Sequence, residues 1–479
     1  AIQALDAASG DLLWQYIRPT SGPQGFGASQ GKGLAIYGDK LFAPTSDGHV
    51  IALDVHTGHL AWDQEVVPSG SGGLSLNSAP IVVKGTVIAG VSLGVSSPGG
   101  CFIIGLDAQT GKERWRFHTI ARPGQPGGDS WNGAPVDERF GGGVWTAGSY
   151  DAQLGLVYFG VGNTYDTATL LLPQPYPMKS KSNDALYTDS TLALDPDTGK
   201  LAWFYQHMNR DVWDLDWAFE QSLITLPIDG KPADLVVTGG KIAMFDAVNR
   251  ADGKYEFSTD LGLQNVVASV DPATGKKNIN PELQPEANKT KLLCPNANGA
   301  RNWPATSYDP ETKILYVPMV ESCADFTWIP GNAAQTAAGG EDMHFTLRPR
   351  PDTDGNFGRI EAVNLETKKV VWIDRQRAPV ASSMLSTAGG LVFNGTRDQQ
   401  FTAYDAANGK ILWHVRLNAS PSSSPVTYAI GRKQYIAVVA GGGGTLDAGG
   451  GGLTPEIDNP VGTTLWTFAL PGASENARQ

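Results

Sequence analysis

The chain has 479 residues with 58 Gly, 31 Pro and 13 Trp, and only 18% of its residues are charged. This composition excludes a coiled coil, a long helical array and a disordered chain, and it is typical of a large, turn-rich β protein. The net charge of −12 and the lack of a long apolar run argue against a nucleic-acid partner and against a membrane span.

An eleven-residue unit recurs along the chain. It reads ALDAASGDLLW near the start and ALDPDTGKLAW further on. In each copy we expect a strand end, a tight turn in which Asp or Thr bonds the local backbone and Gly takes a positive φ, and a second strand that ends at Trp. The copies, of differing strength, cover residues 4–14, 52–62, 105–115, 193–203, 245–255, 362–372 and 403–413.

Short apolar runs bounded by Gly or Pro separate these copies, for example at residues 40–44, 86–90 and 391–395. About four short strands in each repeat of roughly 40 to 50 residues are typical of a β-propeller. We therefore predict an all-β propeller that forms a single domain over residues 1–479, with each repeated Trp packed between blades. Because the chain starts directly before a repeat unit, we expect it to begin inside an incomplete first blade.

Two segments combine polar residues with a high aromatic density. In the first, three Gly at residues 141–143 precede Trp145, and a later strand ends in Gly-Val-Gly-Asn at residues 160–163. This pattern lets a flat ligand approach both backbone and indole, but it also suits a packing Trp on a Gly-rich turn. The second, residues 209–217, holds three Asp and two Trp. Its carboxylates can bind a hard cation or act as a base, and the alternative is a solvated turn with two packing Trp.

A third segment contains Cys294, the run Arg-Asn-Trp-Pro at residues 301–304, and Cys323. In an oxidising compartment the two cysteines can form a disulfide, and two buried thiols are the alternative. Cys101 is expected to be a small core residue.

These features together resemble the quinoprotein alcohol dehydrogenases, a family of eight-bladed propellers that bind pyrroloquinoline quinone (PQQ) and a metal ion. The resemblance covers nearly the whole chain, and it implies eight blades here. It is most specific in one ordered set of residues: Trp145, Asn163, Trp213, Asp214, Lys241 and Asn302.

The resemblance implies a role for each of these side chains at a cofactor and metal site. Trp145 would form the floor on which the quinone stacks. Asn163 would offer its side-chain oxygen to the metal, and Asp214 would be both the general base and a metal ligand. Asp216, two residues further on, would add a second carboxylate to the metal.

Four more residues are expected at the cofactor itself. Lys241 would lie beside the quinone oxygens and assist catalysis, and Asn302 would hydrogen-bond the cofactor together with its neighbour Trp303. Lys32 stands where the family often has a cation near a cofactor carboxylate.

The sequence departs from the family pattern at three places. The stretch 92–100 contains no carboxylate where the family has a metal-binding Glu, and Asp216 is expected to restore that charge. Phe26 and Gly27 stand about where many members have adjacent cysteines, and residues 441–444 are all Gly where a Trp often caps the site. We expect Ca²⁺ as the metal, with a lanthanide as the alternative, and a more open site.

The implied function is oxidation of a small or polymeric alcohol by hydride transfer to PQQ, with electrons passing to a cytochrome c-type acceptor. The family also places the protein in the periplasm or outside the cell, and it favours the disulfide between Cys294 and Cys323. The alternative is a non-catalytic propeller that scaffolds protein assembly at the outer membrane.

Overall fold

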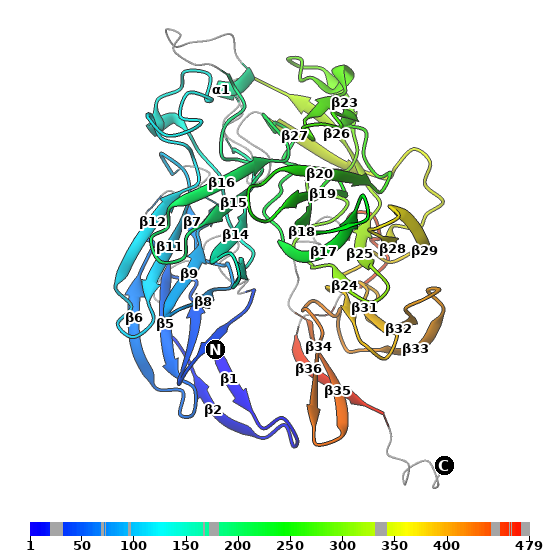
Figure 1. Ribbon diagram of the computed structural model, residues 1–479. Helices are drawn as coiled ribbons and strands as arrows, with labels where there is room; N and C mark the ends of the chain where they lie inside the picture. The colour runs from blue at the N-terminus through cyan, green and yellow to red at the C-terminus, as the bar shows by residue number, and fades with distance from the viewer. Residues whose placement is uncertain are drawn as a thin grey trace. The chain divides into compact units, whose positions relative to one another are not determined.

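The computed structural model describes residues 1–19, 32–68, 71, 73–93, 97–165, 168–171, 182–330, 343–441, 451–458, 460 and 462–470 (Figure 1). The sequence departures at residues 26–27, 94–96 and 442–444 lie outside these residues. The chain divides into two compact units. The first comprises Ala1–Ala4, Trp14–Gly299 and Ala324–Thr346, and the second comprises Leu5–Leu13, Ala300–Cys323 and Leu347–Gln479.

The described residues form six four-stranded antiparallel sheets, in each of which strands adjacent in sequence order are also hydrogen-bonded neighbours. The alternation of short apolar runs and tight turns builds such meanders directly. The six sheets are β3 (Ala35–Tyr37), β4 (Lys40–Pro44), β5 (His49–Asp54) and β6 (Leu60–Glu65); β8 (Ile81–Val83), β9 (Thr86–Gly90), β11 (Phe102–Asp107) and β12 (Glu113–His118); β13 (Ser149–Asp151), β14 (Leu156–Gly160), β15 (Ser190–Leu194) and β16 (Leu201–Gln206); β17 (Ser222–Ile228), β18 (Lys231–Gly239), β19 (Met244–Asn249) and β20 (Tyr255–Asp260); β24 (Ser307–Asp309), β25 (Ile314–Val320), β28 (Gly358–Asn364) and β29 (Lys369–Gln376); and β30 (Leu385–Ser386), β31 (Leu391–Gly395), β32 (Gln400–Asp405) and β33 (Ile411–Arg416).

Smaller sheets and very short helices make up the rest of the regular structure. The smaller sheets are β1 (Ile2–Leu5) with β2 (Leu12–Tyr16); β7 (Leu74–Ser75) with β10 (Ser92–Leu93); β21 (Val267–Val270) with β22 (Lys277–Ile279); β23 (Thr290–Leu293) with β26 (Cys323–Trp328) and β27 (Met343–Arg348); and β34 (Val426–Ile430) with β35 (Lys433–Gly441) and β36 (Thr463–Ala469). The helices are α1 (Ala168–Leu171) and the 3₁₀ turns η1 (Val136–Glu138) and η2 (Pro281–Leu283). The all-β prediction is confirmed, and the number of eight blades stays a prediction.

The repeated Trp fastens one repeat to the next, as predicted. Five of the six repeated indole rings lie so close to the turn Gly of the following copy that a Cβ on that Gly would collide with them, for example Trp62 against Gly111, whereas Trp413 of the last copy is exposed. The small first residue of each motif, such as Ala193 opposite Trp203, leaves room for the indole within its own sheet. The indole Nε1 also donates to a backbone oxygen of the following copy at 2.9 to 3.1 Å: Trp14 to Val55, Trp62 to Ala108, Trp115 to Pro196, Trp203 to Arg250 and Trp372 to Ala406.

The motif turns have the predicted chemistry. Asp54 Oδ1, for example, accepts the backbone N–H groups of His56 and Thr57, and Gly58 has a φ of 72°. Another turn of this kind lies at Asp271 between β21 and β22, and the repeat pattern did not predict it because no Trp follows it.

One repeat was assigned in the wrong register. The fifth copy in the sequence, residues 245–255, begins Phe-Asp, which makes Asp246 the expected turn Asp. In the structure Asn249 occupies that place, since its Oδ1 accepts the Ala251 N–H and Gly253 N donates to its backbone oxygen. Asp246 instead lies on β19 and is fully buried. In this copy Asn replaces the motif Asp, and Phe257 stands where the motif has Trp. The sequence motif was therefore too weak here to fix the register.

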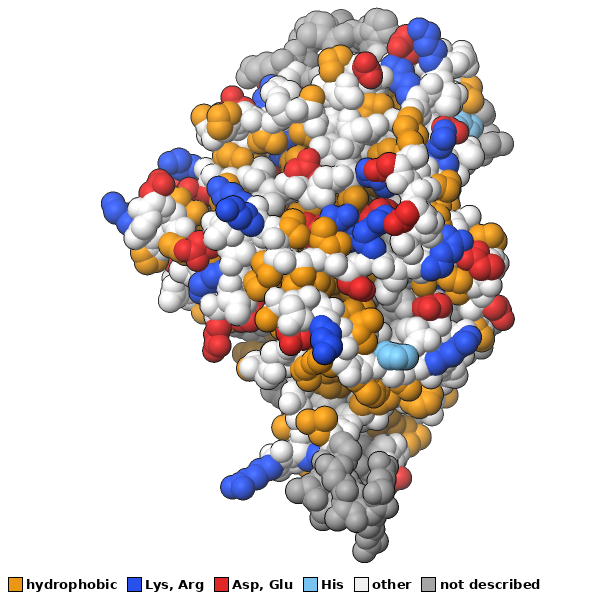
Figure 2. Space-filling model, turned by 90° about the vertical axis from the view of Figure 1, so that its right-hand side faces the viewer, with side chains coloured by type: hydrophobic (Ala, Val, Ile, Leu, Met, Phe, Trp, Pro, Cys, Tyr) orange, Lys and Arg blue, Asp and Glu red, His pale blue; other side chains and the backbone are white. Residues whose placement is uncertain are grey.

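Charged groups are mixed on the surface. On the face drawn in Figure 2, Lys and Arg side chains lie among Asp and Glu side chains, so neither sign dominates that face. Within the described ranges, no helix is long and apolar enough to cross a membrane.

Candidate functional site

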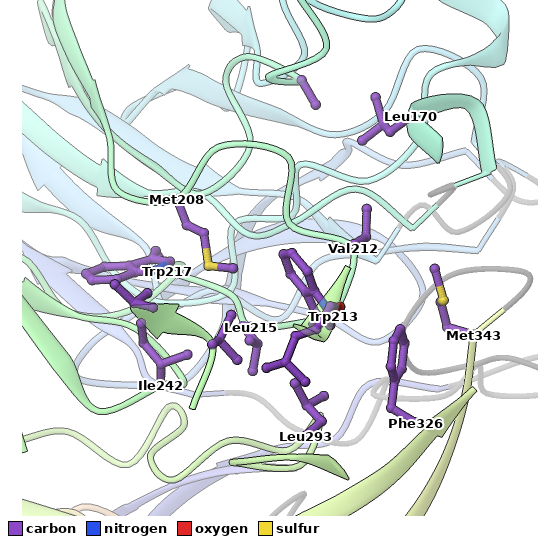
Figure 3. Close-up of a cluster of buried hydrophobic side chains, with 14 of the residues drawn as sticks. Leu170, Met208, Val212, Trp213, Leu215, Trp217, Ile242, Leu293, Phe326 and Met343 are labelled. Carbon is purple, nitrogen blue, oxygen red and sulfur yellow. The ribbon is translucent and has the colours of Figure 1, made fainter. Parts of the chain in front are cut away.

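The acidic segment at residues 209–217 follows β16 and is buried, not solvated. Its apolar side chains, including Trp213, Leu215 and Trp217, pack into a buried cluster of the first unit (Figure 3). Asp211 holds the segment in a tight turn, because its two carboxylate oxygens accept the N–H groups of Trp213 at 2.8 Å and Leu215 at 2.6 Å. The backbone is thus fixed on both sides of Asp214.

Asp214 has a φ of 59°, a left-handed conformation that is uncommon outside Gly. Such backbone positions persist only where the surroundings determine them, and they cluster at functional sites. The packing of the neighbouring tryptophans therefore holds this backbone conformation, and with it the direction of the Asp214 side chain.

Lys241 lies between the two carboxylates of this segment. Its Nζ is 2.9 Å from Asp214 Oδ1 and 2.6 Å from Asp216 Oδ2, and it donates to the Asp214 backbone oxygen at 3.0 Å. Lys241 belongs to the turn between β18 and β19, where its backbone N donates to the Asp216 oxygen at 2.9 Å. The turn and the acidic segment are therefore tied together by both backbone and side chains.

The charges of this group act strongly on one another. Burial alone would lower the pKa of Lys241, but Asp214 and Asp216 outweigh it and raise that pKa, so the ammonium stays charged. Burial raises the pKa of Asp214 well above its usual value, Lys241 opposes this shift, and Asp216 adds to it.

Asn163 reaches the same group from the end of β14. Its backbone N donates to Asp216 Oδ1 at 2.8 Å. Its side chain is fully buried, and neither Oδ1 nor Nδ2 has a hydrogen-bond partner among the described residues. A buried amide without partners is costly, so this side chain is suited to hold a group from outside the chain.

Trp145 lies beside these polar groups and is 8% exposed. A Cβ on Gly162 would come within 2.5 Å of the Trp145 ring and 2.7 Å of Asp216 Oδ1, so the Gly before Asn163 is what lets ring and carboxylate approach this backbone. Lys32 Nζ lies 5.8 Å from the centroid of the Trp145 ring. Burial lowers the pKa of Lys32 to about 7, while the charge of Asp216 opposes that shift.

The structure thus brings together Trp145, Asn163, Asp214, Asp216, Lys241 and Lys32 within the first unit. Asn302 and Trp303 belong to the second unit, where Asn302 is buried and its Oδ1 accepts the Trp303 N–H at 2.8 Å. Their contact with a cofactor stays a prediction.

Two residues that the sequence did not single out belong to this group. Asp189 immediately precedes β15, is fully buried, and has no hydrogen-bond partner for either carboxylate oxygen in the described part of the chain. Burial and the charges of Asp211, Asp216 and Asp214 raise its pKa well above the usual value. Burial, Asp216 and Asp214 likewise raise the pKa of Tyr165. We call Asp189, Asp214, Asp216 and Lys241 the carboxylate cluster.

A second buried polar group lies next to this cluster, and we call it the histidine network. It consists of Thr191, His207, Asp246, Ser258 and Lys277. His207 Nδ1 lies 2.8 Å from Asp246 Oδ2, and its Nε2 lies 2.8 Å from Thr191 Oγ1. Lys277 Nζ and Ser258 Oγ both donate to Asp246, at 2.5 and 2.6 Å.

The histidine network packs against the acidic segment at Trp217. The His207 ring stacks on Trp217 at 4.4 Å with an interplanar angle of 2°, and Lys277 Nζ lies 5.0 Å from the Trp217 ring centroid. His207 N also donates to the Asp189 backbone oxygen. The residues of this network are scattered along the chain, so no sequence motif predicted it.

The donor set suits a hard cation. One amide and two carboxylates offer oxygen ligands of the kind that Ca²⁺ takes, and the unpartnered Asn163 oxygen is available to it. Among the described residues, no three Asp, Glu, His or Cys side chains form a metal-binding group by themselves. A cation held here would therefore draw further ligands from a cofactor or from water.

The cysteines are arranged as the family resemblance implied. Cys294 and Cys323 are disulfide-bonded, and Cys101 is a free, buried thiol. Burial strongly raises the pKa of Cys101, which makes it an inert core residue.

Comparison with known proteins assigns a class to this fold and site. The family model "Glucose/ethanol/alcohol dehydrogenase, beta-propeller domain", which carries the short name PQQ, matches residues 1–258 and 268–436. The sheets described above are therefore those of a β-propeller, and the chain belongs to the PQQ β-propeller family of quinoprotein alcohol dehydrogenases, which are oxidoreductases.

Individual relatives agree with this membership. The quinohemoprotein alcohol dehydrogenase ADH IIB of Pseudomonas putida is 33% identical over 98% of this chain and 69% of its own length. A solved structure of ADHIIG from Pseudomonas putida HK5 has a TM-score of 0.82 at 28% identity and covers 97% of this chain and 70% of that one. A europium-containing methanol dehydrogenase has a TM-score of 0.84 at 27% identity, over 98% of this chain and 87% of its own.

Proposed function

We propose that this protein oxidises an alcohol by hydride transfer to bound PQQ and passes the electrons to a cytochrome c-type acceptor. The observation that carries the proposal is the convergence of Trp145, Asn163, Asp214 and Lys241 in one buried group of the first unit. Relatives named for alcohol oxidation, including a 1-butanol dehydrogenase (cytochrome c), support the reaction type and the acceptor.

Each side chain of the group would hold one part of the reaction system. Trp145 offers an indole face to a flat quinone, and Lys241 offers positive charge to its quinone oxygens. Lys32 would lie near a cofactor carboxylate, and Asn302 and Trp303 are proposed to contact the cofactor as well. Asn163, Asp214 and Asp216 would hold the cation, for which Ca²⁺ is the first choice and a lanthanide the second. When bound, PQQ supplies the hydride acceptor and the cation supplies Lewis-acid polarisation.

Asp214 is proposed to take the hydroxyl proton of the alcohol. A general base works best when its pKa lies near the working pH. Burial moves the pKa of Asp214 upward from the usual carboxylate range, whereas Lys241 keeps it from rising further. A bound cation would pull in the same direction as Lys241, because positive charge favours the ionised carboxylate. The proton then resides on an Asp214 oxygen while the carbon–hydrogen bond of the alcohol breaks.

Lys241 has two tasks in this proposal. Its raised pKa keeps it charged over the whole working range, so it can stabilise negative charge on a quinone oxygen at any ordinary pH. Its bonds to Asp214 and Asp216 also fix both carboxylates in place before substrate arrives, which lowers the cost of orienting the base.

The substrate is proposed to be a small or polymeric alcohol, and the protein is proposed to act in the periplasm or outside the cell as a single domain of eight blades. A non-catalytic scaffold is not favoured, because the family match spans nearly the whole chain and its relatives are named as dehydrogenases.

Reconstitution tests this function. The purified protein is mixed with PQQ and either Ca²⁺ or La³⁺, and reduction of a dye is followed with a panel of alcohols. We expect a bound quinone absorbance spectrum and alcohol-dependent dye reduction with at least one metal. Absence of quinone uptake with every metal would contradict the proposal and favour a scaffold.

A further inference from the structure

Asp189 is a buried carboxylate to which the proposed reaction gives no task. It is fully buried, and both of its carboxylate oxygens lack hydrogen-bond partners among the described residues. Removing a carboxylate from water without a hydrogen bond or an opposite charge is costly. A residue in this state is explained only by a group that comes to it or by a proton that it keeps.

The strand pairing places Asp189 next to the proposed cation ligand Asn163. Asp189 N donates to the Gly162 oxygen at 3.2 Å, directly before Asn163 in the chain, and β15 continues the pairing from Thr191 opposite Gly160. Asp189 also has a φ of 49°, so its backbone is held in a strained, left-handed position. Two fully buried side chains without partners among the described residues thus lie at neighbouring strand ends, Asn163 after β14 and Asp189 before β15.

The charges of the acidic segment and of Lys241 act on the Asp189 carboxyl group. Asp211, Asp216 and Asp214 all act on it as nearby negative charges, and Lys241 acts on it as a positive one. Lys241 Nζ is already bonded to Asp214 and Asp216. The carboxylate cluster therefore contains three carboxyl groups and one ammonium, of which the ammonium contacts Asp214 and Asp216, so the cluster is short of positive charge when all three carboxyl groups are ionised.

We propose that Asp189 is the third carboxylate of the cation site formed by Asn163, Asp214 and Asp216. Its negative charge strengthens cation binding through one water molecule that bridges it to the ion. The gain is larger for a trivalent than for a divalent ion, because the Coulomb attraction grows with the charge of the ion. This inference rests on the proposed function, since it assumes that the site takes a cation beside PQQ.

The test measures cation affinity directly and not turnover. The full-length protein is loaded with PQQ and titrated with Tb³⁺, whose luminescence is excited through the nearby tryptophans, and with Ca²⁺ by calorimetry. In Asp189→Asn we expect the Tb³⁺ dissociation constant to rise by between about 10-fold and 100-fold, as for other residues that support a metal ligand. The Ca²⁺ constant should rise by a smaller factor.

Asn fits this backbone, because Asn tolerates a positive φ better than most residues. Asp197→Asn is the matched control: Asp197 is exposed, and its carboxylate makes a 3.8 Å ion pair with the exposed Lys84, so the loss of its charge should leave both constants unchanged. Asp189→Gly also suits the left-handed backbone and replaces Asp189→Asn if that variant does not fold.

The outcomes separate the two proposals. Unchanged Tb³⁺ and Ca²⁺ affinities in a folded Asp189 variant would overturn the role of Asp189 and leave the proposed function intact. If the dissociation constants for Tb³⁺ and Ca²⁺ rose by the same factor, the inference that Asp189 acts through its charge would be overturned. A wild-type protein that takes up neither PQQ nor either cation would overturn the proposed function itself.

Discussion

The carboxylate cluster and the histidine network are both buried and charged, but they differ in how well their polar atoms are satisfied. In the histidine network, both oxygens of Asp246 and both ring nitrogens of His207 have partners. In the carboxylate cluster, both oxygens of Asp189 lack partners among the described residues, as does the adjacent amide of Asn163. The histidine network therefore has a structural role, and the carboxylate cluster is suited to receive a cation and a cofactor.

The largest effect is expected at the carboxylate cluster, and it concerns activity. Asp214→Asn keeps the size of the side chain but removes a proton acceptor. We expect turnover of the reconstituted enzyme to fall on the order of 10³-fold or more, whereas the absorbance of bound PQQ stays nearly unchanged. The measurement is steady-state dye reduction together with the absorbance spectrum of the loaded variant. Retained turnover would remove Asp214 from the role of base.

The next effect is expected at the histidine network, and it concerns stability. Asp246→Ala leaves the buried ammonium of Lys277 without its carboxylate. Breaking one side of a buried ion pair costs about 3–5 kcal/mol of unfolding free energy. Denaturant titration of the protein without PQQ measures this loss.

Asp246→Asn serves as its control, because it keeps an acceptor for Ser258 and should cost less than Asp246→Ala. If Asp246→Ala were as stable as the wild type, the histidine network would not be the structural support described above.

The smallest effect concerns pH. Burial lowers the pKa of His207 in the folded protein, and Asp246 only partly opposes this. As pH falls below about 6.5, the unfolded chain therefore takes up a proton that the folded protein refuses, and stability falls. We expect this one group to contribute roughly 1.4 kcal/mol of loss for each pH unit below that value.

Unfolding free energies of wild type and His207→Gln at pH 7.5, 6.5 and 5.5 isolate this contribution. The variant should lose less stability on acidification than the wild type does. Ser258→Ala removes a hydrogen bond of the same network but no titrating group, so it should keep the wild-type slope. Parallel slopes for wild type and His207→Gln would show that His207 is not held neutral by burial.

Repeated features were accessible from the sequence, whereas isolated ones were not. The spacing of Asp, Gly and Trp predicted most of the turns and the docking of five indoles, because those copies obey the same local chemistry. The family resemblance also gave the Cys294–Cys323 disulfide and the group around Asp214. Asp189 and His207 belong to no motif, since their burial arises only when β15, β16 and β19 pack in three dimensions. The register error at Asp246 arose because Asn249 and Phe257 stand in that copy where the motif has Asp and Trp.

The indole hydrogen bonds between successive repeats affect how the protein unfolds locally. Each one fastens a repeat only to the next, so the loss of one such bond is felt by its two neighbours first. The sheet of β13–β16 is fastened twice, by Trp115 from the preceding repeat and by its own Trp203 to the following one, as are the two sheets before it, whereas the sheet of β17–β20 takes part in one such bond among the described residues. Amide protons of β14 and β15 should accordingly exchange with solvent more slowly than those of β18 and β19, and the strand end that carries Asn163 is anchored in a doubly fastened sheet.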